Sequence, residues 1–230
     1  IIFFHSGRNI EIMSKESPAK NRKTDRRTLY TRNAIKDALL EALGDKTFEQ
    51  ITVTDVCRRA EITRATYYLH YQTLTEVLDE LLSDALRMAE DSCQDPNADA
   101  LQILNLLAGV QPEHLKENES LLPVCHRVAQ LPKYQVIFHD ETISNYVVNR
   151  IFQSQKQKLI PVYMDACGLS KKEAEMLTLF VITGTYNVNK ALNWNSNSVW
   201  YNIHSILFRF MSGGYERLRK HDTKRETQSI

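Results

Sequence analysis

Apolar residues recur at helical spacing along the first 92 residues of this chain. One stripe lies within 29–46, where every third or fourth position is apolar: Ile35, Leu39, Ala42 and Leu43. A shorter stripe follows Thr52 and consists of Val53, Val56, Cys57 and Ala60. A longer stripe begins after Thr75, which we expect to cap it, and continues to about Ser92. These patterns predict a first helix, a short second helix and a long fourth helix.

The third helix is expected within "ITRATYYLHY", residues 62–71, which contains no acidic residue, Gly or Pro. Thr63 can cap it, and the short turn at Glu61 separates it from the second helix, which predicts a helix-turn-helix. Tyr67 and Tyr71 are four residues apart and therefore share one helical face. We expect their rings to pack in the core with their hydroxyls at its edge.

The rest of the chain also has helical periodicity, after a linker "CQDPNAD" at 93–99. Seven Gly and six Pro among 230 residues, 43% of them apolar, favour long helices over a β architecture. The predicted fold class is therefore all-α. Further helices are expected at 98–109, 112–119, 121–130, 139–167, 170–193 and 197–219.

Charge divides unevenly between the two parts of the chain. Residues 15–75 hold 12 Lys and Arg against 8 Asp and Glu, a net of +4, whereas residues 76–230 hold 16 against 19, a net of −3. A basic N-terminal part is typical of a nucleic-acid-binding domain joined to another domain. A chance fluctuation over 61 residues is the alternative.

Several classes of protein and of site find no support in the sequence. No Gly-rich phosphate loop, GxSxG or HExxH is present, so an enzyme is not expected. The four cysteines lie far apart without a CxxC pair, so we expect no metal site and no cofactor. We expect their thiols to be buried and reduced in a cytoplasmic protein. A thiol sensor is the alternative. The sequence contains no run of 18 apolar residues, so no membrane span is expected.

The stretch "TFEQITVTDVCRRAEITRATYYLHYQTLTEVLDELL" resembles the DNA-binding domain of the tetracycline-repressor (TetR) family of bacterial transcription regulators. The resemblance covers residues 27–82. Three positions depart from the family pattern: Thr47 and Glu61 stand where Gly is common, and Leu74 stands where Lys is common. A glutamate in a left-handed turn conformation would be strained by roughly 1 kcal/mol.

The resemblance implies a repressor that binds a palindromic DNA operator as a homodimer and is released by a small-molecule effector. The alternative is a co-regulator whose C-terminal domain binds a protein partner. The implied organisation is a disordered or basic N-terminal segment at 1–26, a three-helix DNA-binding domain at 27–74, a larger helical effector-binding and dimerisation domain at 75–219, and a polar tail at 220–230. Residues 1–12, which precede Met13, are expected to be an artefact of cloning or of the gene start.

A recognition helix in the major groove reads bases with its first-turn residues. Arg64 is suited to guanine, Ala65 or the Thr66 methyl group to a thymine methyl group, and Tyr68 and His70 to phosphates. An ordinary solvated helix face is the alternative for Arg64 and His70. Thr52 is a further phosphate candidate, and Arg32 with its basic neighbours is expected to attract DNA. The complete set of predicted DNA-binding residues is Arg27, Thr52, Thr63, Arg64, Ala65, Thr66, Tyr68 and His70.

The last two predicted helices carry candidate positions for a four-helix dimer interface, and packing within one chain is the alternative. These positions are Leu179, Ile182, Tyr186, Lys190, Val199, Ile203, Ile206 and Phe210. Large side chains with polar tips are the candidates for an effector pocket, although each could instead belong to the core or the surface. They are His126, Tyr146, Trp194 and Trp200, with His139 as a further candidate.

Overall fold

The computed structural model describes residues 18–92 and 99–225, with side chains at 26–92 and 99–219. Within these residues every regular element is a helix and no strand is formed, which confirms the all-α fold class. The elements are α1 (Pro18–Asp45), η1 (Phe48–Gln50), α2 (Val53–Arg59), α3 (Arg64–Tyr68), α4 (Leu74–Asp91), α5 (Ala100–Gly109), η2 (Pro112–Leu121), α6 (Val124–Ala129), α7 (Gln135–His139), η3 (Glu141–Ile143), α8 (Ser144–Cys167), α9 (Lys171–Ala191) and α10 (Ser198–Arg225).

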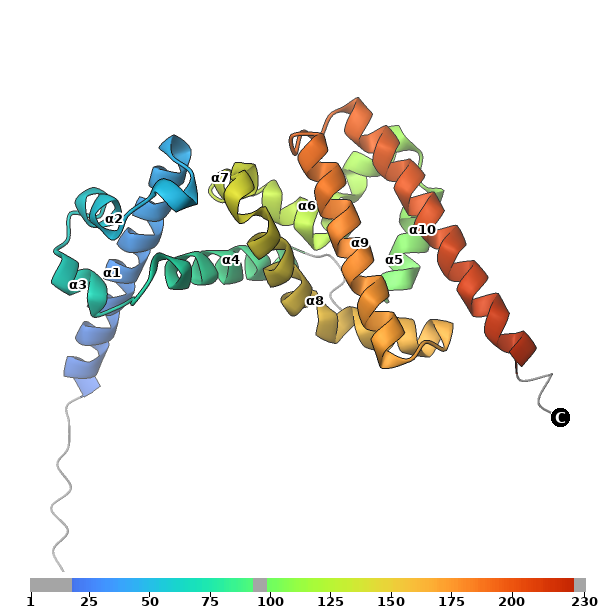
Figure 1. The fold of residues 1–230 in the computed structure, drawn as a ribbon, viewed down its shortest axis with the longest axis horizontal. Helices are drawn as coiled ribbons and strands as arrows, with labels where there is room; N and C mark the ends of the chain where they lie inside the picture. The colour runs from blue at the N-terminus through green and yellow to red at the C-terminus, as the bar shows by residue number, and fades with distance from the viewer. Residues whose placement is uncertain (1–17, 93–98, 226–230) are drawn as a thin grey trace, which may run out of the picture.

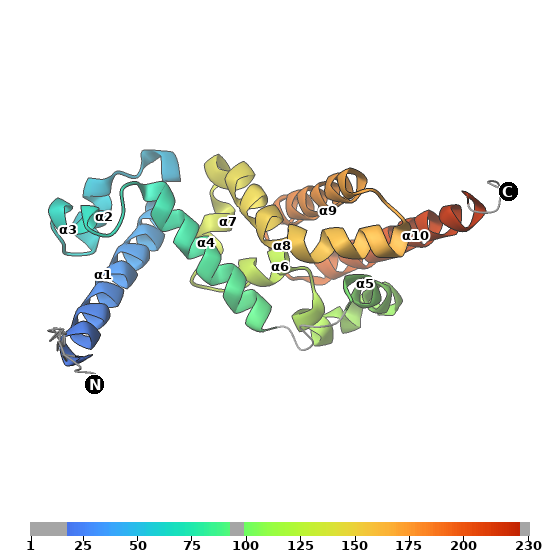
Figure 2. The same cartoon turned by 90° about the horizontal axis from the view of Figure 1, so that it is seen from below.

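The helices form two lobes that α4 joins (Figure 1). The first lobe contains α1, α2 and α3, and α3 lies at its outer end in both views (Figure 2). In the second lobe α9 packs mainly against α8, and α10 packs mainly against α5. Residues 93–98 of the expected linker lie outside the described residues, and its last residue, Asp99, caps α5.

Both ends of the described chain are helical beyond the predicted limits. α1 begins at Pro18, so residues 18–26, predicted as part of a disordered or basic segment, continue the first helix. α10 extends to Arg225, into the predicted polar tail. Proline is tolerated in the first turn of a helix, and no Gly or Pro interrupts either extension. The rest of the N-terminal and C-terminal predictions, at 1–17 and 226–230, lies outside the described residues.

The cap of α4 is Thr73 and not Thr75 as predicted. The Thr73 hydroxyl accepts from the backbone N–H of Glu76, and the Glu76 carboxylate accepts from the N–H of Gln72. A threonine followed three residues later by glutamate is the sequence signature of a capped helix start. Thr73 and Glu76 have this spacing, whereas Thr75 is followed three residues later by Leu78.

The predicted helix at 139–167 is interrupted near its start. Asp140 accepts hydrogen bonds from the N–H and hydroxyl of Thr142, at 2.8 and 2.6 Å, so α8 begins only at Ser144. The other oxygen of Asp140 accepts from the N–H of Phe48 at 2.6 Å. Because Phe48 precedes α2 and Asp140 precedes α8, this buried carboxylate ties the first lobe to the second.

A continuous apolar cluster runs from the first lobe into the second. The buried side of α4 contributes to it along the whole helix, with Val77 and Leu78 near one end and Leu86 and Ala89 near the other. α4 also packs against α1, α6 and α8. A domain boundary at residues 74 and 75 therefore stays a prediction, because the core does not break there.

Candidate nucleic-acid interface

The recognition-helix candidate α3 is a short element fixed at both ends. Thr63 caps it as predicted, because its hydroxyl accepts from the N–H of Thr66 at 3.1 Å. Regular α-helix extends only from Arg64 to Tyr68, half of the stretch 62–71 within which it was expected. In the turn before it, Glu61 has a φ of 53°, the left-handed conformation that was expected to be strained.

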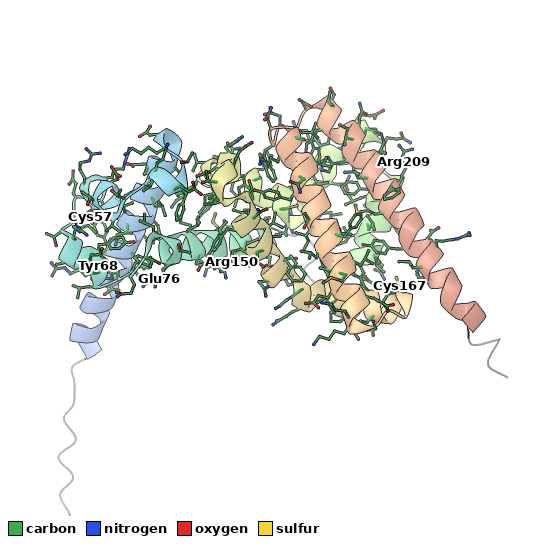
Figure 3. The ribbon with its side chains drawn as sticks, viewed as in Figure 1. Cys57, Tyr68, Glu76, Arg150, Cys167 and Arg209 are labelled. Carbon is green, nitrogen blue, oxygen red and sulfur yellow. The ribbon has the colours of Figure 1, made fainter. Side chains whose placement is uncertain are left out.

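The two faces of α3 have opposite environments. Tyr67 and Tyr71 are 0% and 3% exposed, which confirms that their rings belong to the core. Arg64 and Ala65 are exposed, and the Tyr68 side chain is 40% exposed. Figure 3 shows Tyr68 in the first lobe, far from Arg209 and Cys167 in the second lobe. One face therefore anchors the helix and the other is open to a partner.

Arg64 and Tyr68 lie against each other on the open face. The guanidinium carbon of Arg64 is 6.0 Å from the Tyr68 ring centre, and the nearest nitrogen is 3.5 Å from the Tyr68 hydroxyl. The Tyr68 hydroxyl is the first cause that raises the pKa of Arg64. The pairing leaves the planar guanidinium of Arg64 on the exposed face of the helix.

Three other predicted residues are less accessible to DNA than Arg64 and Ala65, because they are half-buried or already hydrogen-bonded. His70 and Thr66 are half-buried, and the Thr66 hydroxyl lies 2.9 Å from that of Thr63. Thr52 is exposed, but its hydroxyl donates to Asp55 at 2.7 Å in the predicted capping box. That hydroxyl is the first cause that lowers the pKa of Asp55, to about 2. A phosphate at Thr52 would thus meet a carboxylate beside it.

The sequence reasoning missed Leu69. Its side chain is 82% exposed at the end of α3, the most exposed of the large apolar side chains in the described residues. An apolar side chain on a DNA-facing helix can contact a thymine methyl group. The signal was its position, because Leu69 lies between two residues already predicted to face DNA, Tyr68 and His70.

An ionic cluster between α1 and α4 holds α3 in place. The Tyr71 hydroxyl donates to Glu80 at 2.8 Å, and Arg32 contacts both Glu80 and the Tyr71 ring, with the guanidinium 4.6 Å from the ring centre. Lys36 pairs with Glu80 and Asp84 at 3.1 and 2.5 Å. Burial alone would raise the pKa of Glu80, but the hydrogen bonds from Arg32, Tyr71 and Lys36 lower it. Arg32, expected to attract DNA, instead belongs to this internal cluster.

The other arginines on α1 and α2 have different surroundings. Arg27 is exposed on α1, as a DNA contact would require. Arg58 lies 3.7 Å from Asp55, and Arg59 pairs with Asp45 at 2.5 Å.

The second lobe contains a cavity of about 210 Å³ between the α8–α9 pair and the α5–α10 pair. None of the four predicted effector-pocket residues lines it. Trp200 is buried between the rings of His126 and His204, at centroid distances of 4.0 and 3.7 Å. Trp194 is buried and donates to the carbonyl of Phe138 at 3.1 Å. These two side chains were predicted for an effector pocket; they are buried against other residues of the lobe and do not line this cavity.

Tyr146 and the further candidate His139 also lie outside the lining of this cavity. The Tyr146 hydroxyl donates to Asp79 of α4 at 2.5 Å, and His139 is exposed at the end of α7. The polar tips of Tyr146 and Trp194 thus mark hydrogen bonds within the protein. The residues that line the cavity are mostly aliphatic, which composition along one helix cannot distinguish from ordinary core.

The predicted dimer positions divide between core and surface. Ile182 and Tyr186 are buried within the chain, and Lys190 and Ile203 are half-buried. Large exposed apolar side chains nevertheless gather on both helices: Met176, Leu179 and Phe180 on α9, and Val199, Ile206 and Phe210 on α10. Gly184 also lies on α9. A Cβ atom added there would point into open space, with no atom outside its own stretch of helix within 4 Å.

Cys57, Cys125 and Cys167 are buried free thiols, and burial raises the pKa of Cys125 to about 12. Cys93 lies outside the described residues. In the part of the chain that the structure describes, no three His, Cys, Asp or Glu side chains come together as a metal site. Nor is any helix there long and apolar enough to cross a membrane.

Two curated relatives are named as regulators. The "Uncharacterized HTH-type transcriptional regulator YxbF" of Bacillus subtilis (strain 168) is 31% identical over 106 residues, which is 46% of this chain. That match spans only 25% of the relative's own length. The "Probable acrEF/envCD operon repressor" of Escherichia coli (strain K12) is 21% identical over 197 residues, 80% of this chain and 84% of the relative.

No family model and no solved structure matches the chain. The similarity to these two proteins supports a transcriptional regulator, and neither relative is named as an enzyme.

Proposed function

We propose that this protein is a TetR-type transcriptional regulator that binds a palindromic operator as a homodimer and acts as a repressor released by a small molecule. The observation that carries the proposal is the two-faced helix α3, which buries Tyr67 and Tyr71 and presents Arg64, Ala65, Tyr68 and Leu69 to solvent. A short helix held rigidly by its own aromatic side chains can enter the major groove without losing its support. The names of the two relatives agree with a regulator.

The exposed residues of α3 suit two different tasks. Arg64 can donate two hydrogen bonds to guanine, and Ala65 and Leu69 can contact thymine methyl groups. Tyr68 and His70 can donate to phosphates, which fix the position of the helix and carry no base identity. Arg27 on α1 adds a positive charge for the DNA backbone.

Removing the Arg64 side chain tests this assignment of tasks. Arg64→Ala is expected to weaken binding to the cognate duplex by roughly 1–3 kcal/mol, because a bidentate base contact is lost. Lys172→Ala removes an equally charged and exposed side chain at the start of α9, and it should leave the affinity unchanged. Fluorescence anisotropy with a labelled duplex measures both, and an equal loss for the two variants would reject the assignment.

The dimer is supported by the exposed apolar side chains of α9 and α10, since large apolar patches are uncommon on monomers. Light scattering is expected to give twice the 26.6 kDa of one chain. Phe210→Glu, at a side chain 70% exposed on α10, should return the mass to that of a monomer. Leu69→Glu is the matched control on α3 and should leave the mass unchanged. A wild-type monomer at micromolar concentration contradicts the proposal.

A small molecule fits the second lobe better than a protein partner because a cavity is present between its helices. The first turn of α6 lines this cavity with Val124 and Cys125. Arg127 of the same helix donates to the carbonyl of Ala89 and lies 3.3 Å from the hydroxyl of Ser92, both at the end of α4. An occupant that moves α6 would therefore move α4 and, through the cluster around Glu80, the orientation of α3.

A further inference from the structure

We propose that the cavity of the second lobe selects a compact, uncharged and mostly apolar molecule with one oxygen acceptor, whose polar end lies at the hydroxyl pair of Tyr163 and Tyr215. This inference names the class of effector for the proposed regulator. Only its regulatory consequence, release of DNA, rests on the proposed function. The binding itself is argued from the size, charge and polar groups of the cavity.

The volume of the cavity suits an occupant of about one ring with a short substituent. Its volume is about 210 Å³. An engineered apolar cavity of roughly 150 Å³ in another protein stays dry and binds benzene. The present cavity therefore accommodates a molecule about two to four non-hydrogen atoms larger than benzene.

The charge of the lining argues against an ionic occupant. The described residues around the cavity include no Asp, Glu, Lys or His, so a cation would find no carboxylate. Arg127 is the one charged side chain among them, and it donates to the carbonyls of Leu122, at 2.9 Å, and Ala89. Its Nε and one terminal nitrogen are thus directed to the main chain of the loop before α6 and of α4. An ammonium group that leaves water without a carboxylate partner loses several kcal/mol. A carboxylate would have to compete for the Arg127 guanidinium with two main-chain carbonyls and the Ser92 hydroxyl.

Gln155 and Thr185 are further polar residues of the lining, and Gln155 donates to Glu90 at 3.0 Å. The polar end proposed here consists of two stacked tyrosines from different helices. Tyr163 of α8 and Tyr215 of α10 are 4% and 6% exposed, both line the cavity, and their ring centres are 5.0 Å apart. The Tyr215 hydroxyl donates to the Tyr163 hydroxyl at 2.9 Å. Two hydroxyl groups carry two protons, and the bond between them uses one, so the Tyr163 proton remains for an acceptor atom of the occupant.

Both hydroxyls stay protonated under ordinary conditions, because burial is the first cause that raises the pKa of each. A neutral donor in an apolar site favours a carbonyl, ether or hydroxyl oxygen. It gives no charge compensation to a carboxylate. An occupant without any acceptor would leave this proton unpaired, which lowers its affinity.

Four probes of similar size separate these features: ethylbenzene, acetophenone, benzoate and benzylammonium. Equilibrium dialysis against the full chain is expected to show acetophenone binding most tightly, with ethylbenzene roughly fivefold weaker, the value of one hydrogen bond. Benzoate and benzylammonium should bind at least about tenfold more weakly than acetophenone. Benzoate or benzylammonium binding as tightly as acetophenone, or no binding by any probe, overturns the proposal.

Matched tyrosine variants locate the polar end. Tyr163→Phe should weaken acetophenone about fivefold and leave ethylbenzene within about twofold, which removes the preference for the ketone. Tyr201→Phe is the control, because Tyr201 is on α10, is not among the residues lining the cavity, and donates to Glu119 at 2.9 Å. A preference for acetophenone that survives in Tyr163→Phe contradicts the assignment. If that variant fails to fold, the ranking of the four probes on the wild type still decides the proposal.

The same samples separate this inference from the proposed function. Probe binding is measured on the chain alone, and DNA binding is measured on the chain without a probe. Acetophenone bound by a chain that binds no DNA sequence would leave the cavity assignment standing and reject the regulator. DNA bound in a sequence-specific way by a chain that takes up no probe would reject the cavity assignment alone.

Discussion

Replacing Tyr71 by alanine is expected to lower the free energy of unfolding by roughly 3–5 kcal/mol, the range for truncating a buried aromatic residue. The Tyr71 ring is 3% exposed and packs in the core of the first lobe. The change also removes the hydroxyl that donates to Glu80 and the ring beneath the Arg32 guanidinium. Urea denaturation monitored by circular dichroism measures the loss.

Two further variants, one at Tyr71 itself and one at Tyr68, are the controls for this prediction. Tyr71→Phe keeps the ring and loses only the bond to Glu80, so it should cost about 1–2 kcal/mol. Tyr68→Ala truncates an exposed ring three positions earlier and should cost less than about 1 kcal/mol. Equal losses for Tyr68→Ala and Tyr71→Ala would mean that the buried and open faces of α3 are assigned wrongly.

Lowering the pH from 7.5 to 5 is expected to reduce the stability of the chain by about 4 kcal/mol through two buried histidines. Burial is the main cause that lowers the pKa of His126 to about 3 and of His204 to about 4, from an ordinary value of 6.5. Above pH 6.5 both rings are neutral in the folded and unfolded chain, and the difference vanishes. Below it the unfolded chain binds protons that the folded chain excludes, at about 2 kcal/mol per ring by pH 5.

The packing around Trp200 explains why these rings resist protonation. His204 donates from Nδ1 to the carbonyl of Trp200 at 3.0 Å, and its other nitrogen has no partner among the described residues. Neither nitrogen of His126 makes a well-formed hydrogen bond to a described residue, and the Asn189 side chain only partly opposes the effect of burial on its pKa. His204→Phe keeps an aromatic ring against Trp200 and should remove about half of the pH dependence, whereas His114→Gln, at an exposed site, should leave it intact. Denaturation curves at both pH values test this, and an unchanged pH dependence in His204→Phe would refute it.

Local interactions explain why the helix starts of the first lobe were predictable. The caps at Thr52 and Thr63 join residues three apart, so the sequence alone contains both partners. The burial of Tyr67 and Tyr71 also follows from helical spacing. The predicted cap of α4 was wrong because two threonines lie close together at its start, and only Thr73 is followed three residues later by a glutamate, Glu76.

In the second lobe, contacts between residues far apart in the sequence decide where the pocket candidates lie. Trp194 and Phe138 are 56 residues apart, and Tyr146 and Asp79 are 67 apart. No periodicity along one helix shows that these polar tips are satisfied inside the protein. Arg32 was expected to attract DNA for the same reason, since its partner Glu80 lies 48 residues away. The cavity is equally non-local, because its aliphatic lining comes from α5, α6, α8, α9 and α10 and from the loop before α6.

Selection of binding sites from a random duplex DNA pool tests most directly whether α3 reads DNA sequence. The wild type is expected to enrich a two-fold symmetric site whose half-sites are about one helical turn apart, near 34–36 Å. Arg64→Ala should enrich the same site with relaxed preference at one base pair in each half, while Tyr68→Phe should keep every preference and bind more weakly. No enriched site for the wild type, or an unchanged site for Arg64→Ala together with an altered one for Tyr68→Phe, would contradict the account.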